Sequence, residues 1–170
     1  MELSRFERLV LWNQYEMLRL SGKGDCDYYA KCQIILSSGF EGEYEYVANI
    51  VHRDVLSISE CSFVSDVLNM FDALSRIGEL GGEKLDTVMS KFSGFDGNSE
   101  TELMSYANFL IEKQQKWTYL GIKNFNSHMP MRRSYDRMLS VFKSIPLAEQ
   151  FSLTFEQGNS ILEARAAYLT

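Results

Sequence analysis

Residues 57–77, SISECSFVSDVLNMFDALSRI, decide the fold class of this chain. Ser57 and Glu60 have the spacing of a capping box, in which two side chains satisfy free N–H groups at the start of a helix. The apolar side chains that follow recur every three or four residues, which is the period of one helix face: Phe63, Val64, Val67, Met70, Phe71, Leu74 and Ile77. The stretch therefore predicts a long helix that begins near residue 58 and buries one side.

The helical period continues on both sides of this stretch, and long runs of strand-like alternation are absent. It predicts further helices at residues 3–20, 27–38, 43–51, 103–117 and 130–145 and from 154 onward, with a shorter one within 83–92. Residues 118–129 show no period, but their apolar side chains make a free loop unfavourable. We therefore expect an ordered loop there.

Length and composition place these helices in one domain. A chain of 170 residues can bury one full core, whereas two complete domains would be crowded. Hydrophobic residues make up 45% and charged residues 24%, which is the balance of an ordinary globular protein. We predict an all-α, compact single-domain bundle of about seven or eight helices over residues 1–170. A weak seam is expected near residues 78–98, where glycines gather.

The charge and the hydropathy pattern exclude several classes of protein. A net charge of −6 disfavours attraction of the whole surface to nucleic acid or anionic lipid. The longest uncharged runs hold only about ten residues, whereas a membrane-spanning helix needs roughly 20. The first ten residues mix acidic and basic side chains, unlike a signal peptide. We therefore expect a cytoplasmic protein with no membrane association.

The cysteines and histidines give no sign of a metal site. Cys26, Cys32 and Cys61 form an odd set without a CxxC pair, and neither His52 nor His128 lies at ligand spacing from them. In a reducing compartment such thiols are small core residues or unused side chains. We expect no metal and no cofactor.

Residues 9–18, LVLWNQYEML, place two amides inside an apolar stretch. On a helical wheel Asn13 falls near the centre of an apolar stripe formed by Leu3, Phe6, Leu9, Val10, Met17 and Leu20. A buried amide needs partners, because leaving it unpaired costs about 1–3 kcal/mol. The favoured interpretation is that Asn13 is buried and bonds the backbone of a loop such as SGFDG or FNSHM. The alternative is a ligand pocket lined by Asn13, Gln14 and Tyr15.

Asp96 and His128 are the remaining candidates for a pocket or a chemical site. Asp96 lies between glycines in GFDG, where a turn is favoured over a role as acid, base or metal ligand. His128 has no nucleophile at a recognisable position, so a loop role is favoured over catalysis. GxSxG, HExxH and P-loop motifs are absent. No catalytic residue is assigned, and an enzyme, for example a hydrolase, is the third choice of function.

Basic residues gather in the second half of the chain. Residues 103–146 carry seven bases and two acids, a charge of +5 that leaves −11 for the rest of the chain. The candidate patch for an anionic partner is Lys113, Lys116, Lys123, Arg132, Arg133 and Arg137. Aromatic side chains among these bases suit single-stranded nucleic acid, while opposite charges on one chain suit self-association. A solvated or subunit-facing surface is favoured, and nucleic acid is the second choice.

Four stretches resemble the YfbU-like family of small, uncharacterised bacterial proteins: LVLWNQYEML, YYAKCQIILSSGFEGEY, SGFDG and FNSHMPMRRSYDRMLSVF. The likeness extends from residue 6 to the region of residue 146 and is weak across 80–92 and in the C-terminal tail. It implies an all-helical cytoplasmic protein that self-associates, and it offers no catalytic residues to assign. Some family members carry a DNA-binding ribbon-helix-helix module ahead of this domain, and none is expected here.

The sequence as a whole favours a helical interaction protein that forms homo-oligomers without a cofactor. A nucleic-acid-binding or regulatory accessory protein that uses the basic segment 113–143 is the alternative. No motif identifies a small-molecule ligand.

Overall fold

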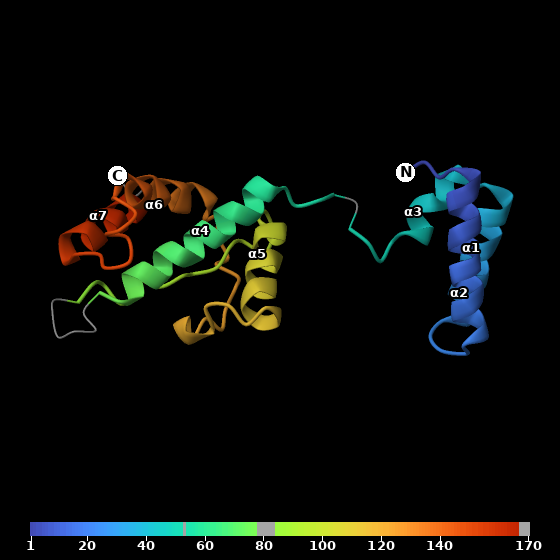
Figure 1. The fold of residues 1–170 in the computed structure, drawn as a ribbon, viewed down its shortest axis with the longest axis horizontal. Coiled ribbons are helices and arrows are strands. Elements are labelled where there is room, and N and C mark those ends of the chain that lie inside the picture. The colour runs from blue at the N-terminus through green and yellow to red at the C-terminus, as the bar shows by residue number, and fades with distance from the viewer. Residues whose placement is uncertain (53, 78–83, 167–170) are drawn as a thin grey trace. The chain divides into compact units, whose positions relative to one another are not determined.

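The computed structural model describes residues 1–52, 54–77 and 84–166 (Figure 1). These residues form seven α-helices with short 3₁₀ and π segments and no β-strand, so the predicted all-α fold class is confirmed. The chain divides into two compact units, Met1–Val55 and Leu56–Thr170, which we call unit 1 and unit 2. Each unit has its own hydrophobic core.

Unit 1 contains four helical elements: α1 (Arg5–Leu20), α2 (Cys26–Ser38), the 3₁₀ helix η1 (Glu41–Glu43) and α3 (Tyr44–Val47). α1 and α2 pack side by side (Figure 1). Ser4 and Glu7 form a capping box at the start of α1. Gly39 ends α2 with a φ of 69°, a left-handed conformation that glycine adopts without strain. The predicted helix at 43–51 is shorter in the structure, because only four of its residues form α3.

α1 buries the face opposite to the apolar stripe. Tyr15 is only 8% exposed, and its hydroxyl donates to the Val47 carbonyl at 2.7 Å. Together with Cys32 and Leu36, these side chains form the core of unit 1. The expectation that Asn13 is buried and fastens a loop to the helix is therefore wrong, because Asn13 is exposed. The physical reason is that α1 is apolar on two faces, and α2 packs against the aromatic one.

Unit 2 contains the remaining elements: α4 (Ile58–Ser75), α5 (Thr101–Asn108), the π-helix η2 (Phe109–Lys113), the 3₁₀ helix η3 (Thr118–Leu120), α6 (Arg132–Ser144) and α7 (Phe155–Ala166). α4 lies between α5 on one side and the packed pair α6 and α7 on the other (Figure 1). The Ser57 hydroxyl accepts the N–H of Glu60 at the start of α4. Thr154 and Gln157 cap α7 reciprocally.

α4 supplies the centre of the core of unit 2. The predicted apolar face is the buried one, and its side chains are almost fully inaccessible to solvent: Val64, Val67, Leu68, Met70, Phe71 and Leu74. They pack against a second group from the later helices and from the loops: Phe95, Ala107, Leu110, Tyr135, Met138 and Ile161. The helix predicted from residues 57–77 is therefore confirmed, both in its position in the sequence and in the face that it buries.

The segment between α4 and α5 differs from the prediction. Its described residues, 84–100, contain turns and extended backbone and no helix, so the short helix predicted within 83–92 is not found there. Residues 78–83 lie outside the described residues, and with them part of the predicted seam at 78–98. The single domain over residues 1–170 and this seam stay predictions. The boundary between the two units falls between residues 55 and 56.

The ordered loop predicted at 118–129 is present. It contains η3, and Ile122 and Phe125 pack against the core of unit 2. Within the described ranges, none of the helices combines the length and the hydropathy that a bilayer span requires.

Candidate functional site

Two loops of unit 2, residues 93–97 and 124–128, are joined by an isolated parallel β-bridge between Phe95 and Asn126. We call them the crossed loops and the bridge between them the crossing. The Phe95 N–H donates to the Phe125 carbonyl at 2.9 Å, and the Ser127 N–H donates to the Phe95 carbonyl at 3.0 Å. The Asn126 side-chain oxygen accepts the N–H groups of Gly97 and His128. Gly94 has a φ of 90°, and a Cβ there would overlap the Phe125 carbonyl, so only glycine allows this approach. The SGFDG and FNSHM stretches therefore bind each other.

Glu100 anchors the crossed loops to α6. Its carboxylate is 8% exposed and accepts the N–H groups of Met131 at 2.9 Å and Arg132 at 2.7 Å, at the start of that helix. It also accepts the Asp96 N–H at 3.0 Å. A negative charge is favourable at a helix N-terminus, where the first N–H groups have no partners within the helix. Glu100 is thus a cap supplied from a distant part of the sequence.

Asp96 forms a turn within the first of these loops. Its Oδ2 accepts the N–H and, at 2.6 Å, the hydroxyl of Ser99. This hydroxyl bond is the main reason why the pKa of Asp96 lies below its usual range, and the charge of His128 acts in the same direction. Oδ1 is buried and has no hydrogen-bond partner among the described residues. Asp96 and His128 thus lie close enough for the His128 side chain to contribute to the lowered pKa of Asp96.

Tyr135 of α6 anchors the first of these loops through hydrogen bonds to residues 93 and 94. Its ring is fully buried among Phe71, Phe92 and Phe95. Its hydroxyl donates to the Gly94 carbonyl at 3.1 Å and accepts the Ser93 N–H at 3.2 Å. Burial raises the pKa of the Tyr135 phenol to about 12.

This raised pKa predicts a loss of stability at alkaline pH. The folded state holds the phenol proton more tightly than the unfolded state, whose pKa is about 10, so the contribution is complete below pH 10. It should be lost as the pH rises towards 12, by up to about 2–3 kcal/mol. Urea unfolding between pH 8 and pH 11 measures this decline. Tyr135→Phe should be less stable at neutral pH and should show a shallower decline, and an equal decline in both proteins would contradict the assignment.

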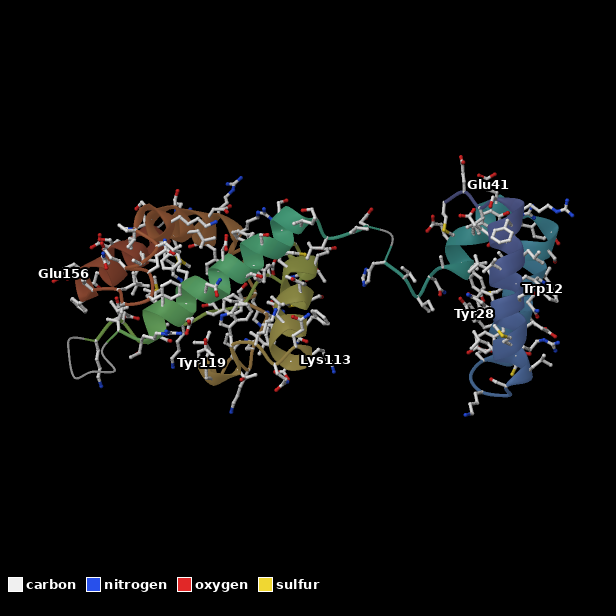
Figure 2. All side chains as sticks on the ribbon, in the orientation of Figure 1. Trp12, Tyr28, Glu41, Lys113, Tyr119 and Glu156 are labelled. Carbon is white, nitrogen blue, oxygen red and sulfur yellow. The ribbon has the colours of Figure 1, made fainter. Side chains whose placement is uncertain are left out.

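A groove in unit 2 lies beside the crossed loops. Its volume is about 920 Å³, and His128 is one of its lining residues. The end of α4, residues 84–93 and residues 119–128 form its walls. Tyr119, labelled in Figure 2, belongs to the last of these segments. Arg165 positions the middle segment by donating to the carbonyls of Met89 and Lys91.

The six bases of the predicted anionic-partner patch do not form one free surface. Arg132 pairs with Glu60 at 3.0 Å and lies over the Phe63 ring. Arg137 donates to the carbonyls of Ala164 and Arg165 in α7. The other four are exposed, in η2 and the residues after it, in the loop and on α6: Lys113, Lys116, Lys123 and Arg133. Figure 2 shows Lys113 at the end of the helical stretch that α5 begins.

The structure does not bring Asn13, Gln14 and Tyr15, the three residues of the alternative pocket, to one face of α1. Asn13 and Gln14 are exposed, whereas Tyr15 faces the core of unit 1, where its ring lies within about 6 Å of the Tyr28 and Tyr29 rings. Neighbouring positions on a helix are about 100° apart and cannot all face one cavity. Asp96 and His128 belong to unit 2, away from this group in the sequence and in a different compact unit.

The exposed face of α1 is the second candidate site. Phe6 and Leu20, at its two ends, are 73% and 72% exposed. Leu9, Val10 and Met17 between them are also exposed. From Phe6 the positions Val10, Asn13, Met17 and Leu20 follow at spacings of four and three, which is the heptad spacing of a helix-pairing face. The sequence analysis found the stripe but assigned it to the core.

Comparison with known proteins agrees with the resemblance noted in the sequence. A model of the YfbU domain matches residues 1–164. The UPF0304 protein MJECS11 of Methanocaldococcus jannaschii is 35% identical, over 95% of this chain and 99% of that protein. This relative is archaeal, so family membership alone does not indicate a bacterial source. The match covers nearly all of both units, and the chain belongs to the YfbU family.

Proposed function

We propose that this protein is a self-associating interaction protein and that the exposed stripe of α1 binds the same stripe of a second copy. The observation that carries the proposal is the apolar face that the packing of unit 1 leaves exposed, formed by Phe6, Leu9, Val10, Met17 and Leu20, which we call the α1 stripe. Such a contact would bury side chains that otherwise face water along the full length of a helix.

The size of the α1 stripe supports this role. A fully exposed aromatic side chain presents roughly 150–250 Å² of surface, and aliphatic ones present less. The five members of the stripe are 39–73% exposed, so together they offer on the order of 500 Å². A monomer seldom exposes a contiguous apolar patch of more than a few hundred Å². A standard interface buries about 800 Å² per partner, and somewhat more than half of this is apolar. The α1 stripe therefore has about the apolar area that one side of a dimer needs.

The pattern of the α1 stripe favours a second copy as the partner. Asn13 stands at its centre, and Phe6 and Leu20 lie seven residues to either side. A two-fold axis at Asn13, perpendicular to the helix, would therefore place Phe6 of one copy against Leu20 of the other and allow the two amides to bond each other. No charged residue interrupts the stripe, and its borders carry both signs, with Arg5 and Glu7 near one end. Two copies would meet without net repulsion.

The nucleic-acid alternative has weaker support. Of the three arginines on α6, Arg132 and Arg137 already bind partners within unit 2. Arg133 and the exposed lysines remain for phosphate contacts, and a few scattered contacts would give weak, salt-sensitive binding. Self-association is therefore the function that we propose.

Met17→Lys tests the proposal. A lysine in the middle of an apolar interface would be buried without a partner, twice in each dimer, so the dissociation constant should rise about 100-fold or more. Sedimentation velocity across a micromolar concentration series measures this change. Val88→Lys is the matched control, since Val88 is at least as exposed as Met17, at 74% against 64%, but lies in unit 2, and it should associate like the wild type.

Circular dichroism should show that both variants keep their helices. A wild-type chain that stays monomeric over the series would contradict the proposal. So would equal weakening by both substitutions. Dissociation by salt alone, with no effect of Met17→Lys, would instead place the interface on the charged segments.

A further inference from the structure

We propose that the groove of unit 2 binds a small phosphorylated ligand that carries a flat ring, the chemistry of a nucleoside monophosphate. This site is separate from the α1 stripe and does not depend on self-association. At about 920 Å³ the groove lies within the range of small-molecule sites, which is roughly 300–1,000 Å³.

The charge of the groove identifies the anionic part of the ligand. Among the described residues that line it, the charged side chains are those of Lys84, Lys91 and Lys123, and His128 lies in the same wall as Lys123. The chain as a whole has 23 acidic and 17 basic residues, yet within the described ranges 54–77 and 84–166 no acidic residue lines the groove. A concave wall of one sign concentrates ligands of the opposite charge. Lysine ammonium groups are common phosphate ligands in proteins.

The walls carry basic groups from two directions. Lys91 belongs to the segment before the crossed loops, and Lys123 and His128 belong to the segment that ends in them. Lys91, Lys123 and His128 are all exposed, so their charged groups can reach a ligand. Arg165 and the Phe95–Asn126 crossing fix the two segments through backbone bonds. The backbone that carries the basic side chains is thus already fixed, so less conformational entropy is lost when a ligand binds.

Aromatic and aliphatic side chains supply the place for a ring. Leu120 and Ile122 line the groove beside the buried rings of Phe71 and Phe92, and Tyr119, which also lines it, is 67% exposed. Stacking of a nucleobase on an aromatic side chain contributes favourably and tolerates any base. Hydroxyl and amide side chains between these groups can bond a sugar or a base edge, among them Thr87, Ser90 and Asn124. An apolar wall beside a cationic one matches a ligand with a ring and a phosphate.

Isothermal titration of the full-length chain with AMP, adenosine and inorganic phosphate tests the proposal. AMP should bind more tightly than either part alone. The double variant Lys91→Ala/Lys123→Ala should raise the dissociation constant for AMP about tenfold or more, since it removes one exposed lysine from each of the two wall segments. The matched control is Lys113→Ala/Lys116→Ala, which removes the same charge from exposed positions of unit 2 outside the groove. It should change the constant by less than about twofold.

Tyr119→Ala separates the two parts of the ligand. It should weaken AMP and leave inorganic phosphate unchanged. Absence of AMP binding at millimolar concentration would overturn the proposal, and so would equal losses in the two lysine double variants. Equal affinity for AMP and adenosine would exclude the anion site, and equal affinity for AMP and phosphate would exclude the ring site.

Discussion

Glu100→Ala is expected to lower the free energy of unfolding of unit 2 by about 3–5 kcal/mol. The substitution removes a buried charge that accepts three backbone N–H groups, those of Asp96, Met131 and Arg132. Hydrogen bonds to a charged group contribute about 1.5–3 kcal/mol each, and buried donors left without partners add a penalty. Urea unfolding followed by the fluorescence of Trp117, in a Trp12→Phe background, reports on unit 2 alone.

A second variant at position 100 separates charge from side-chain size, and a variant at an exposed glutamate is the control. Glu100→Gln keeps one acceptor oxygen but turns an NH₂ group towards N–H donors, so it should still lose about 2 kcal/mol or more. Glu112→Ala, at an exposed position, should change stability by less than about 0.5 kcal/mol. If Glu100→Ala were as stable as Glu112→Ala, the capping role of Glu100 would be wrong.

Phe95→Ala is expected to cost about 3–5 kcal/mol as well. Its ring is fully buried against the rings of Phe63, Phe92 and Tyr135, and removal of such a ring leaves a cavity. The same residue joins the two loops through its backbone, so the variant should also loosen residues 93–97 and 124–128. Hydrogen exchange at the Phe95 and Ser127 amides, both bonded in the crossing, measures this second effect.

Phe151→Ala is the control for that experiment, because Phe151 is 69% exposed in the same unit. It should cost less than about 0.5 kcal/mol and leave both amides protected. Faster exchange in both variants would mean that unit 2 opens as a whole and that the crossing has no separate stability.

Local signals in the sequence were sufficient for most of the helices. In α4 the Ser cap, the helical period of the apolar residues and the packing in the core all indicate the same helix with the same buried face. The reciprocal cap of Thr154 and Gln157 was equally reliable. Burial of an individual face was less predictable. α1 has an aliphatic stripe and an aromatic face, and periodicity alone does not say which one α2 covers.

The candidate site was harder to predict, because its bonds join distant residues. Glu100 and Met131 are 31 positions apart in the sequence. The residues around either one give no indication that the two form a hydrogen bond. One signal was present. α6 begins after Met129, Pro130 and Met131, none of which can serve as a side-chain cap, so its first N–H groups have to bond water or an acceptor from elsewhere in the chain. The groove could not be inferred from spacing either, since its three wall segments are separated in the chain and meet only through the fold.

Cysteine cross-linking at position 13 tests the central claim most directly. In a chain with Cys26→Ser and Cys61→Ser, Asn13→Cys would place a single exposed thiol at the centre of the α1 stripe, while Cys32 stays buried. The thiol would face its equivalent across the two-fold axis, and two facing Cα atoms closer than about 7 Å can form a disulfide. Mild oxidation should therefore give a covalent dimer from Asn13→Cys and none from Lys31→Cys, which is exposed on α2. Equal yields from the two positions, or no covalent dimer from Asn13→Cys, would contradict self-association through the α1 stripe.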